Sequence, residues 1–182
     1  YSYPLNNGIN TIDYQNDFDG LAYICYYADE NPENYPNIKV HFINGEINGY
    51  LSPEKTNEEM LEICKNAPNR CIDVYGKKVH SVWQAQGLKD YCKASDNQSL
   101  GFRQYMNVLD SLIQWEHRLL GLEKYNRVPT NRTMAYVNYT YYMFQGGYGV
   151  SFKYDCEPRV LNCRTLMYND DDAIWGLSHE WG

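Results

Sequence analysis

The residue types with the clearest chemistry stand at the end of the sequence, in His179-Glu180-Trp181-Gly182. They match the first four positions of HExxH, a zinc-binding pattern whose second histidine follows four residues after the first. On a helix, two histidines at this spacing share one face and can hold one Zn²⁺, and the intervening glutamate can polarise a metal-bound water. His179 is therefore a candidate metal ligand and Glu180 a candidate catalytic residue, in a motif cut where the second histidine is expected.

A helix is expected to carry this pair. Three consecutive acids, Asp170 to Asp172, precede the apolar run Ala173 to Leu177. Acids in this position cap a helix and complement its dipole, and we favour that role over calcium binding. His179 and Glu180 then fall about two turns into the helix.

A long helix, a strand and a glycine-rich turn are expected upstream of this helix. An apolar stripe at helical spacing predicts a long core helix from about Leu100 to Leu120, ended by Gly121. The run Thr133 to Phe144 alternates like one long strand with two half-polar faces, which is typical of an edge strand beside a cleft. The glycine-rich turn Gly146 to Gly149 follows, and it lacks the lysine of a phosphate-binding loop.

Strand patterns dominate the first part of the chain. Leu21 to Tyr27 and Ile38 to Ile43 are strand-like, which predicts a β-rich, sandwich-like portion over residues 1–50. Thr56 to Glu59 fits a helix capping box, and Cys71 to Trp83 alternates with period two again. The expected fold class is α+β, with residues 51–182 forming a second unit.

Composition narrows the possible partners. The 182 residues carry a formal net charge of −7, and the 16 basic residues are scattered, which argues against nucleic-acid binding. No segment approaches the roughly 20 apolar residues of a membrane-spanning helix. Tyrosine is frequent, with 19 residues that could build strands or stack on sugar rings. The six cysteines form no CxxC pair and leave disulfide bonding open: Cys25, Cys64, Cys71, Cys92, Cys156 and Cys163.

The order of these elements, together with Ala173 to Gly182, resembles the enhancin-like, mucin-degrading zinc metallopeptidases of gut bacteria and some viruses. That family carries a pattern close to IWGxxHExGH around its site. Upstream segments resemble its early strands and next hairpin, namely Ser2 to Asn10, Asp19 to Ile24, Lys39 to Phe42 and Asn48 to Tyr50. The resemblance spans almost the whole chain.

This resemblance implies a zincin-like α/β catalytic domain whose first part is residues 51–182. His179 would be the first zinc ligand and Glu180 the general base that takes a proton from the attacking water. The second histidine and a glutamate ligand would follow Gly182, so the chain alone is expected to be inactive. The parent protein would be a secreted or cell-surface endopeptidase acting on mucin-like glycoproteins.

Other functions remain open at this stage. A non-catalytic carbohydrate- or protein-binding module would use the tyrosines as stacking platforms, and the terminal His-Glu pair would then be accidental. A glycosidase ranks lower because no two carboxylates stand out as a pair. The histidines other than His179 are interpreted as structural: His41, His80 and His117.

Overall fold

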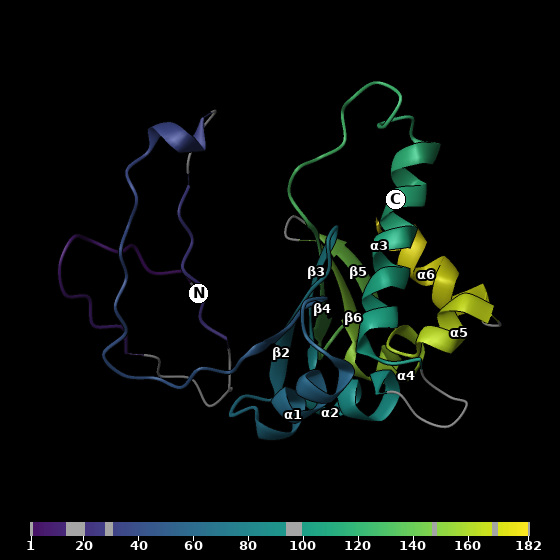
Figure 1. Cartoon of the computed structure of the whole chain (residues 1–182), viewed down its shortest axis with the longest axis horizontal. Helices are drawn as coiled ribbons and strands as arrows, with labels where there is room; N and C mark the ends of the chain where they lie inside the picture. Colours follow the sequence, from purple (N-terminus) through teal and green to yellow (C-terminus); the bar gives the residue numbers. More distant parts are fainter. Residues whose placement is uncertain are drawn as a thin grey trace.

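The fold is a six-stranded mixed sheet with helices on one side (Figure 1). The computed structural model describes residues 2–13, 21–27, 31–93, 100–146, 149–168 and 171–181. This arrangement confirms the expected mixture of helices and strands. No helix in the described ranges is long and apolar enough to cross a membrane.

Short loops connect most of the elements. The strands are β1 (Tyr50–Leu51), β2 (Cys71–Tyr75), β3 (Val79–Gln84), β4 (Thr133–Asn138), β5 (Met143–Gly146) and β6 (Gly149–Lys153). The α-helices are α1 (Asn57–Asn66), α2 (Ala85–Gly87), α3 (Phe102–Leu119), α4 (Glu157–Val160), α5 (Cys163–Tyr168) and α6 (Asp171–Trp181). Short turns of other helix types are η1 (Pro32–Asn34), η2 (Leu88–Cys92) and η3 (Tyr154–Cys156).

The sheet order is β1-β2-β3-β4-β6-β5. β1 and β2 are parallel, as are β3 with β4 and β4 with β6, whereas β2 runs antiparallel to β3 and β5 antiparallel to β6. β1 and β5 therefore form the two edges, and the antiparallel strand β5 lies at the edge nearest α6.

The single strand expected from Thr133 to Phe144 is corrected by this topology. β4 ends at Asn138 because the Asn138 side-chain oxygen accepts the N–H groups of Thr140 and Tyr141, at 2.9 and 2.8 Å, and turns the chain. β4 lies between β3 and β6, and it is β5 that forms the edge. The turn between β5 and β6 is confirmed, although Gly147 and Tyr148 lie outside the described residues.

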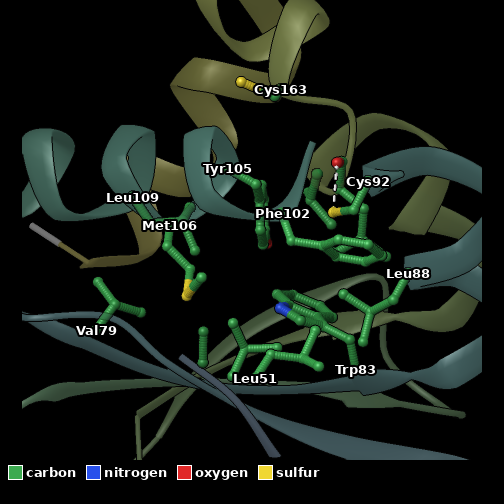
Figure 2. Close-up of a cluster of buried hydrophobic side chains, with 14 of the residues drawn as sticks. Leu51, Val79, Trp83, Leu88, Cys92, Phe102, Tyr105, Met106, Leu109 and Cys163 are labelled. Atoms are coloured by element: carbon green, nitrogen blue, oxygen red, sulfur yellow. Dashed lines mark hydrogen bonds between the residues drawn. The ribbon is translucent and has the colours of Figure 1, made fainter. Parts of the chain in front are cut away.

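The main hydrophobic core lies between α3 and the sheet (Figure 2). The expected stripe is buried over most of its length, and alternate residues of β3 face it from the sheet. Trp83 at the centre is fully buried and packs at 5.9 Å, between ring centroids, from Phe152 of β6. The buried α3 residues are Phe102, Tyr105, Met106, Leu109, Leu112 and Ile113. Leu119 and Leu120, also part of the predicted stripe, are exposed because the helix there extends beyond the sheet.

A carboxylate on α3 fixes the turn between β2 and β3. Asp110 accepts three backbone N–H groups, from Lys77 at 2.8 Å, Lys78 at 2.7 Å and Val79 at 3.2 Å. Gly76 approaches the same carboxylate so closely that a Cβ there would lie 2.6 Å from Oδ1. The helix therefore holds this hairpin by hydrogen bonds in addition to apolar packing.

The described residues before Tyr50 form none of the strands expected there. Residues 21–27 and 38–43 form no strand and pair with no described strand, and their apolar side chains are largely exposed, as at Phe42 and Ile43. Strand-like alternation indicates which side chains share a face, but a strand also needs a neighbouring strand to pair with its backbone N–H and C=O groups. Residues 14–20, which include part of the predicted early strands, lie outside the described ranges. The division into two units near residue 50 stays a prediction.

The structure answers two questions that the sequence raised, about the capping box of α1 and about the cysteines. The capping box is confirmed, since the Thr56 hydroxyl accepts the Glu59 N–H and the Glu59 carboxylate accepts the Thr56 N–H. All six cysteines lie within the described residues, and none is in a disulfide bond. Most are buried, and Cys92 donates its S–H to the Leu161 carbonyl at 3.0 Å.

A buried carboxyl group also ties the end of β3 to α4. Glu157 is 3% exposed, and its Oε1 accepts the Gln84 N–H at 2.9 Å. Gly87 packs so tightly against this group that a Cβ there would overlap Oε2. Burial raises the pKa of the Glu157 carboxyl to about 7, although the Gln84 N–H acts in the opposite direction.

Replacing Asp110 tests its hold on the hairpin. We expect Asp110→Ala to lower the free energy of unfolding by about 3 kcal/mol, because three backbone N–H groups lose a charged acceptor. Asp110→Asn, which keeps one carbonyl oxygen, should lose less. Urea denaturation gives both values, with Ser111→Ala as the neighbouring control expected to change stability by about 0.5 kcal/mol or less. Equal stability of Asp110→Ala and the unmodified chain would contradict this role.

Glu157 should make stability depend on pH. Its pKa rises from 4.5 unfolded to about 7 folded, so the neutral form is favoured by folding. This contribution is fully present below pH 4.5 and is lost as the pH rises through about 7, a change of roughly 3 kcal/mol. Between pH 5 and 8, the unfolding free energy of Glu157→Gln should therefore fall less than that of the unmodified chain. Glu62→Gln, on an exposed surface, should follow the unmodified chain, and parallel pH curves for all three proteins would refute the assignment.

Candidate active-site helix

The helix α6 carries both residues singled out by the sequence. It begins at Asp171, as the acidic run predicts, although Asp170 lies outside the described residues. α6 packs against the edge strand β5 and also contacts α3, α4, α5 and β6. Gly176 and Leu177 are buried in these contacts, so the middle of the helix is anchored in the fold.

A glycine sets how closely α6 approaches the edge strand. A Cβ on Gly176 would lie 2.9 Å from the Met143 Sδ and 3.0 Å from its Cε. Such distances are shorter than ordinary van der Waals contacts, so any larger residue would push the Met143 thioether aside. The glycine thus lets the first residue of β5 lie directly against the helix.

His179 and Glu180 follow Gly176 by three and four residues. On a helix, residues at these spacings lie on the same side, one turn further along. The face of α6 that meets β5 therefore continues into the His179 and Glu180 positions. His179 is exposed and Glu180 is partly buried, so both remain accessible.

The neighbouring strand β5 is suited to an extended peptide. β5 pairs with β6 on one side, with Met143 opposite Phe152 and Phe144 opposite Ser151. Its other side pairs with no described strand. A free strand edge presents backbone N–H and C=O groups that a peptide can match by strand addition. The structure thus places a helix with a histidine and a glutamate beside an open sheet edge.

The described residues do not complete a metal site. Among them, no group of three His, Cys, Asp or Glu side chains is placed to hold an ion. His179 suits a zinc ligand by its donor atom and exposure, but a catalytic zinc needs three protein ligands. His179 and Glu180 are brought together by their adjacency in sequence.

Of the other histidines, His80 lies on β3, within the sheet. His80 Nε2 lies 2.5 Å from Asp73 Oδ1, and the Tyr23 hydroxyl donates to the same oxygen at 2.9 Å. Tyr75 stacks on the His80 ring with centroids 4.2 Å apart. This arrangement joins the first part of the chain to β2 and β3, which agrees with a structural role for His80. Residues 21–27 and 71–84 are far apart in sequence, and no motif signalled their contact.

Sequence comparisons leave the family unassigned, because no protein-family model and no curated protein matches the chain. Solved structures do match. The chain superposes on a metallopeptidase in complex with Tn antigen with a TM-score of 0.64 and 21% identity, over 77% of this chain and 25% of that one. A metallopeptidase from Bacteroides thetaiotaomicron gives a TM-score of 0.62 and 21% identity, over 75% of this chain and 22% of that one.

A third similar structure is the catalytic module of the metalloprotease ZmpA from Clostridium perfringens. It gives a TM-score of 0.57 and 17% identity, over 72% of this chain and 28% of that module. This chain spans about a quarter of the length of these structures. At such identities the likeness establishes the fold, and the chain has the α/β fold found in part of metallopeptidase catalytic modules.

Proposed function

We propose that this chain is part of a metal-dependent endopeptidase of the enhancin-like family. The observation that carries the proposal is the placement of His179 and Glu180 on the helix that packs against the antiparallel edge strand β5. The fold shared with metallopeptidase catalytic modules supports it. The HExxH-like sequence supports it independently of the fold.

In this proposal, each residue has one role. His179 would be a ligand of a zinc ion, and the remaining ligands would come from residues that follow Gly182 in the parent protein. The ion, when bound, would act as a Lewis acid on a peptide carbonyl. Glu180 would accept the proton of the attacking water and return it to the leaving amine. The open edge of β5 would hold the substrate backbone in an extended form.

We further propose a glycoprotein substrate and a location outside the cell, secreted or at the cell surface. A similar metallopeptidase has been solved with Tn antigen bound, which supports a glycan-bearing substrate for this chain's parent. Mucin-like proteins, which carry dense glycans outside cells, would be the natural class. No nucleic acid is expected, in agreement with the net charge of −7.

Glu180→Gln in the parent protein tests the proposed base. We expect the rate of hydrolysis of a mucin-type glycopeptide to fall by roughly 100-fold or more. Glutamine keeps the shape of the side chain but cannot accept the proton of the attacking water. The zinc content, measured by elemental analysis, should stay unchanged because Glu180 is not a ligand. Glu58→Gln, an exposed residue of α1, is the matched control and should keep full activity. Undiminished activity of Glu180→Gln would remove Glu180 from the mechanism.

The chain of residues 1–182 alone should be inactive. It supplies one proposed ligand, whereas a catalytic zinc requires three. Dialysis against micromolar zinc should leave less than one equivalent bound, and the chain should not cleave the glycopeptide. Cleavage by residues 1–182 that a chelator abolishes would contradict the ligand assignment. Glycan binding without cleavage by the zinc-containing parent protein would instead favour the alternative of a non-catalytic carbohydrate-binding module.

A further inference from the structure

An open surface pocket of about 530 Å³ lies at the other edge of the sheet, beside β1 and β2. We call it the β1–β2 pocket, and the residues that matter for its chemistry are Tyr50, Ser52, Glu54, Tyr75, Lys77 and Arg132. Five strand spacings separate β1 from β5, which places the pocket roughly 24 Å across the sheet from the edge beside α6. The pocket is therefore separate from the proposed peptidase site.

A fixed arginine lines the β1–β2 pocket. Arg132 donates from Nε to the Gly76 carbonyl at 2.8 Å, and its guanidinium carbon lies 5.6 Å from the centroid of the Tyr75 ring. These contacts hold the guanidinium in place. Among the described residues, its two terminal nitrogens have no acceptor and form no ion pair. An oriented arginine with free N–H groups is a good receptor for a carboxylate or sulfate, which it can bind with two parallel hydrogen bonds.

Two lysines add positive charge around this arginine. Lys77 lines the pocket and makes no ion pair within the described part of the chain. Lys55 lies over the Tyr50 ring, with Nζ 3.6 Å from the centroid, and donates to the Ser52 hydroxyl at 3.3 Å. Lys77 and Arg132 thus line the pocket, and Lys55 lies over its Tyr50 wall, in a chain whose net charge is −7. Such a concentration favours an anionic ligand.

One carboxylate faces these cations. Glu54 lines the same pocket, and a hydrogen bond from Ser52 is the main cause that lowers the pKa of its carboxyl group. An ionised carboxylate accepts hydrogen bonds and donates none, so it can hold the hydroxyl groups of a ligand. A simple inorganic anion would gain nothing from this group. The combination suits a ligand with an anionic end and a hydroxylated end.

Aromatic rings form a wall of the pocket. Tyr50 and Tyr75 meet edge to face, with centroids 5.7 Å apart and an angle of 89° between the rings. One face of Tyr75 is covered by His80, at 4.2 Å between centroids. Their rings and hydroxyl groups therefore line the cavity with apolar and polar surface together. The volume lies within the range of roughly 300–1,000 Å³ typical of small-molecule sites.

We propose that the β1–β2 pocket binds an acidic sugar, meaning a hydroxylated ring that carries a carboxylate or a sulfate. The anionic group contacts Arg132 and Lys77, and Glu54 accepts the ring hydroxyls. This binding needs neither a metal ion nor peptide cleavage, so its test is independent of the proposed peptidase function.

Calorimetric titration of residues 1–182 tests this site, with glucuronic acid, galactose 6-sulfate, galactose and inorganic sulfate as probes. One or both acidic sugars should bind, and comparison of the two shows whether the site prefers carboxylate or sulfate. Galactose and inorganic sulfate should bind at least 10-fold more weakly than the preferred acidic sugar. Neutral galactose binding as tightly would overturn the anion contact, and sulfate binding as tightly would overturn the sugar contact. Absence of binding by both acidic sugars would refute the proposal.

Two variants locate the ligand in the pocket. Arg132→Ala should weaken the preferred acidic sugar by 10-fold or more, and Lys77→Ala by several-fold. Arg127→Ala, which removes an exposed arginine of the loop after α3, is the matched control and should bind like the unmodified chain. Circular dichroism checks that each variant is folded, and Lys77→Ala covers the case in which Arg132→Ala does not fold. Unchanged affinity in every one of these two variants that folds would place the ligand elsewhere.

Discussion

The packing of α3 against one face of the sheet is the interaction on which the rest of the structure depends. Six side chains of α3 are buried there, and each contributes about 1.5–3 kcal/mol when fully removed from water. Asp110 adds a directional constraint, because its carboxylate accepts three N–H groups of the turn between β2 and β3. With α3 fixed in this way, α6 has to lie beside it, over β6 and the edge strand β5.

The close contact between α6 and β5 connects this packing to the proposed chemistry. Gly176 brings the helix against Met143, and the same face of α6 carries His179 and Glu180 one turn later. The side chains that could act on a peptide therefore lie next to a strand edge that could bind its backbone. A rigid helix and a rigid strand position such groups more precisely than loops do.

The two edges of the sheet differ in chemistry. At the β5 edge, a strand that pairs on one side with no described strand lies beside a helix with a histidine and a carboxylate, an arrangement that suits an extended peptide. The β1 edge combines a fixed guanidinium, two lysines and one carboxylate around two tyrosines, which suits a small anionic ligand. Some of the tyrosines make stacking contacts within the fold. Tyr75 stacks on His80, and Tyr139 stacks on Tyr154 with ring centroids 5.9 Å apart.

The sequence by itself determined the elements whose signals are local. The stripe of α3, the capping box of α1, and the helix that carries His179 and Glu180 follow from side-chain spacing and hydrogen bonds between near neighbours. Only the tertiary structure decided which strand is the edge, because β4 becomes an inner strand by pairing with β3 and β6, and the β3 pairing joins residues distant in sequence. Segments 21–27 and 38–43, which pair with no described strand, show the same limit, since alternation does not provide a pairing strand. Arg132, Tyr50 and Lys77 come from three separate regions of the chain, so their meeting depends on contacts between residues distant in sequence, which no local pattern encodes.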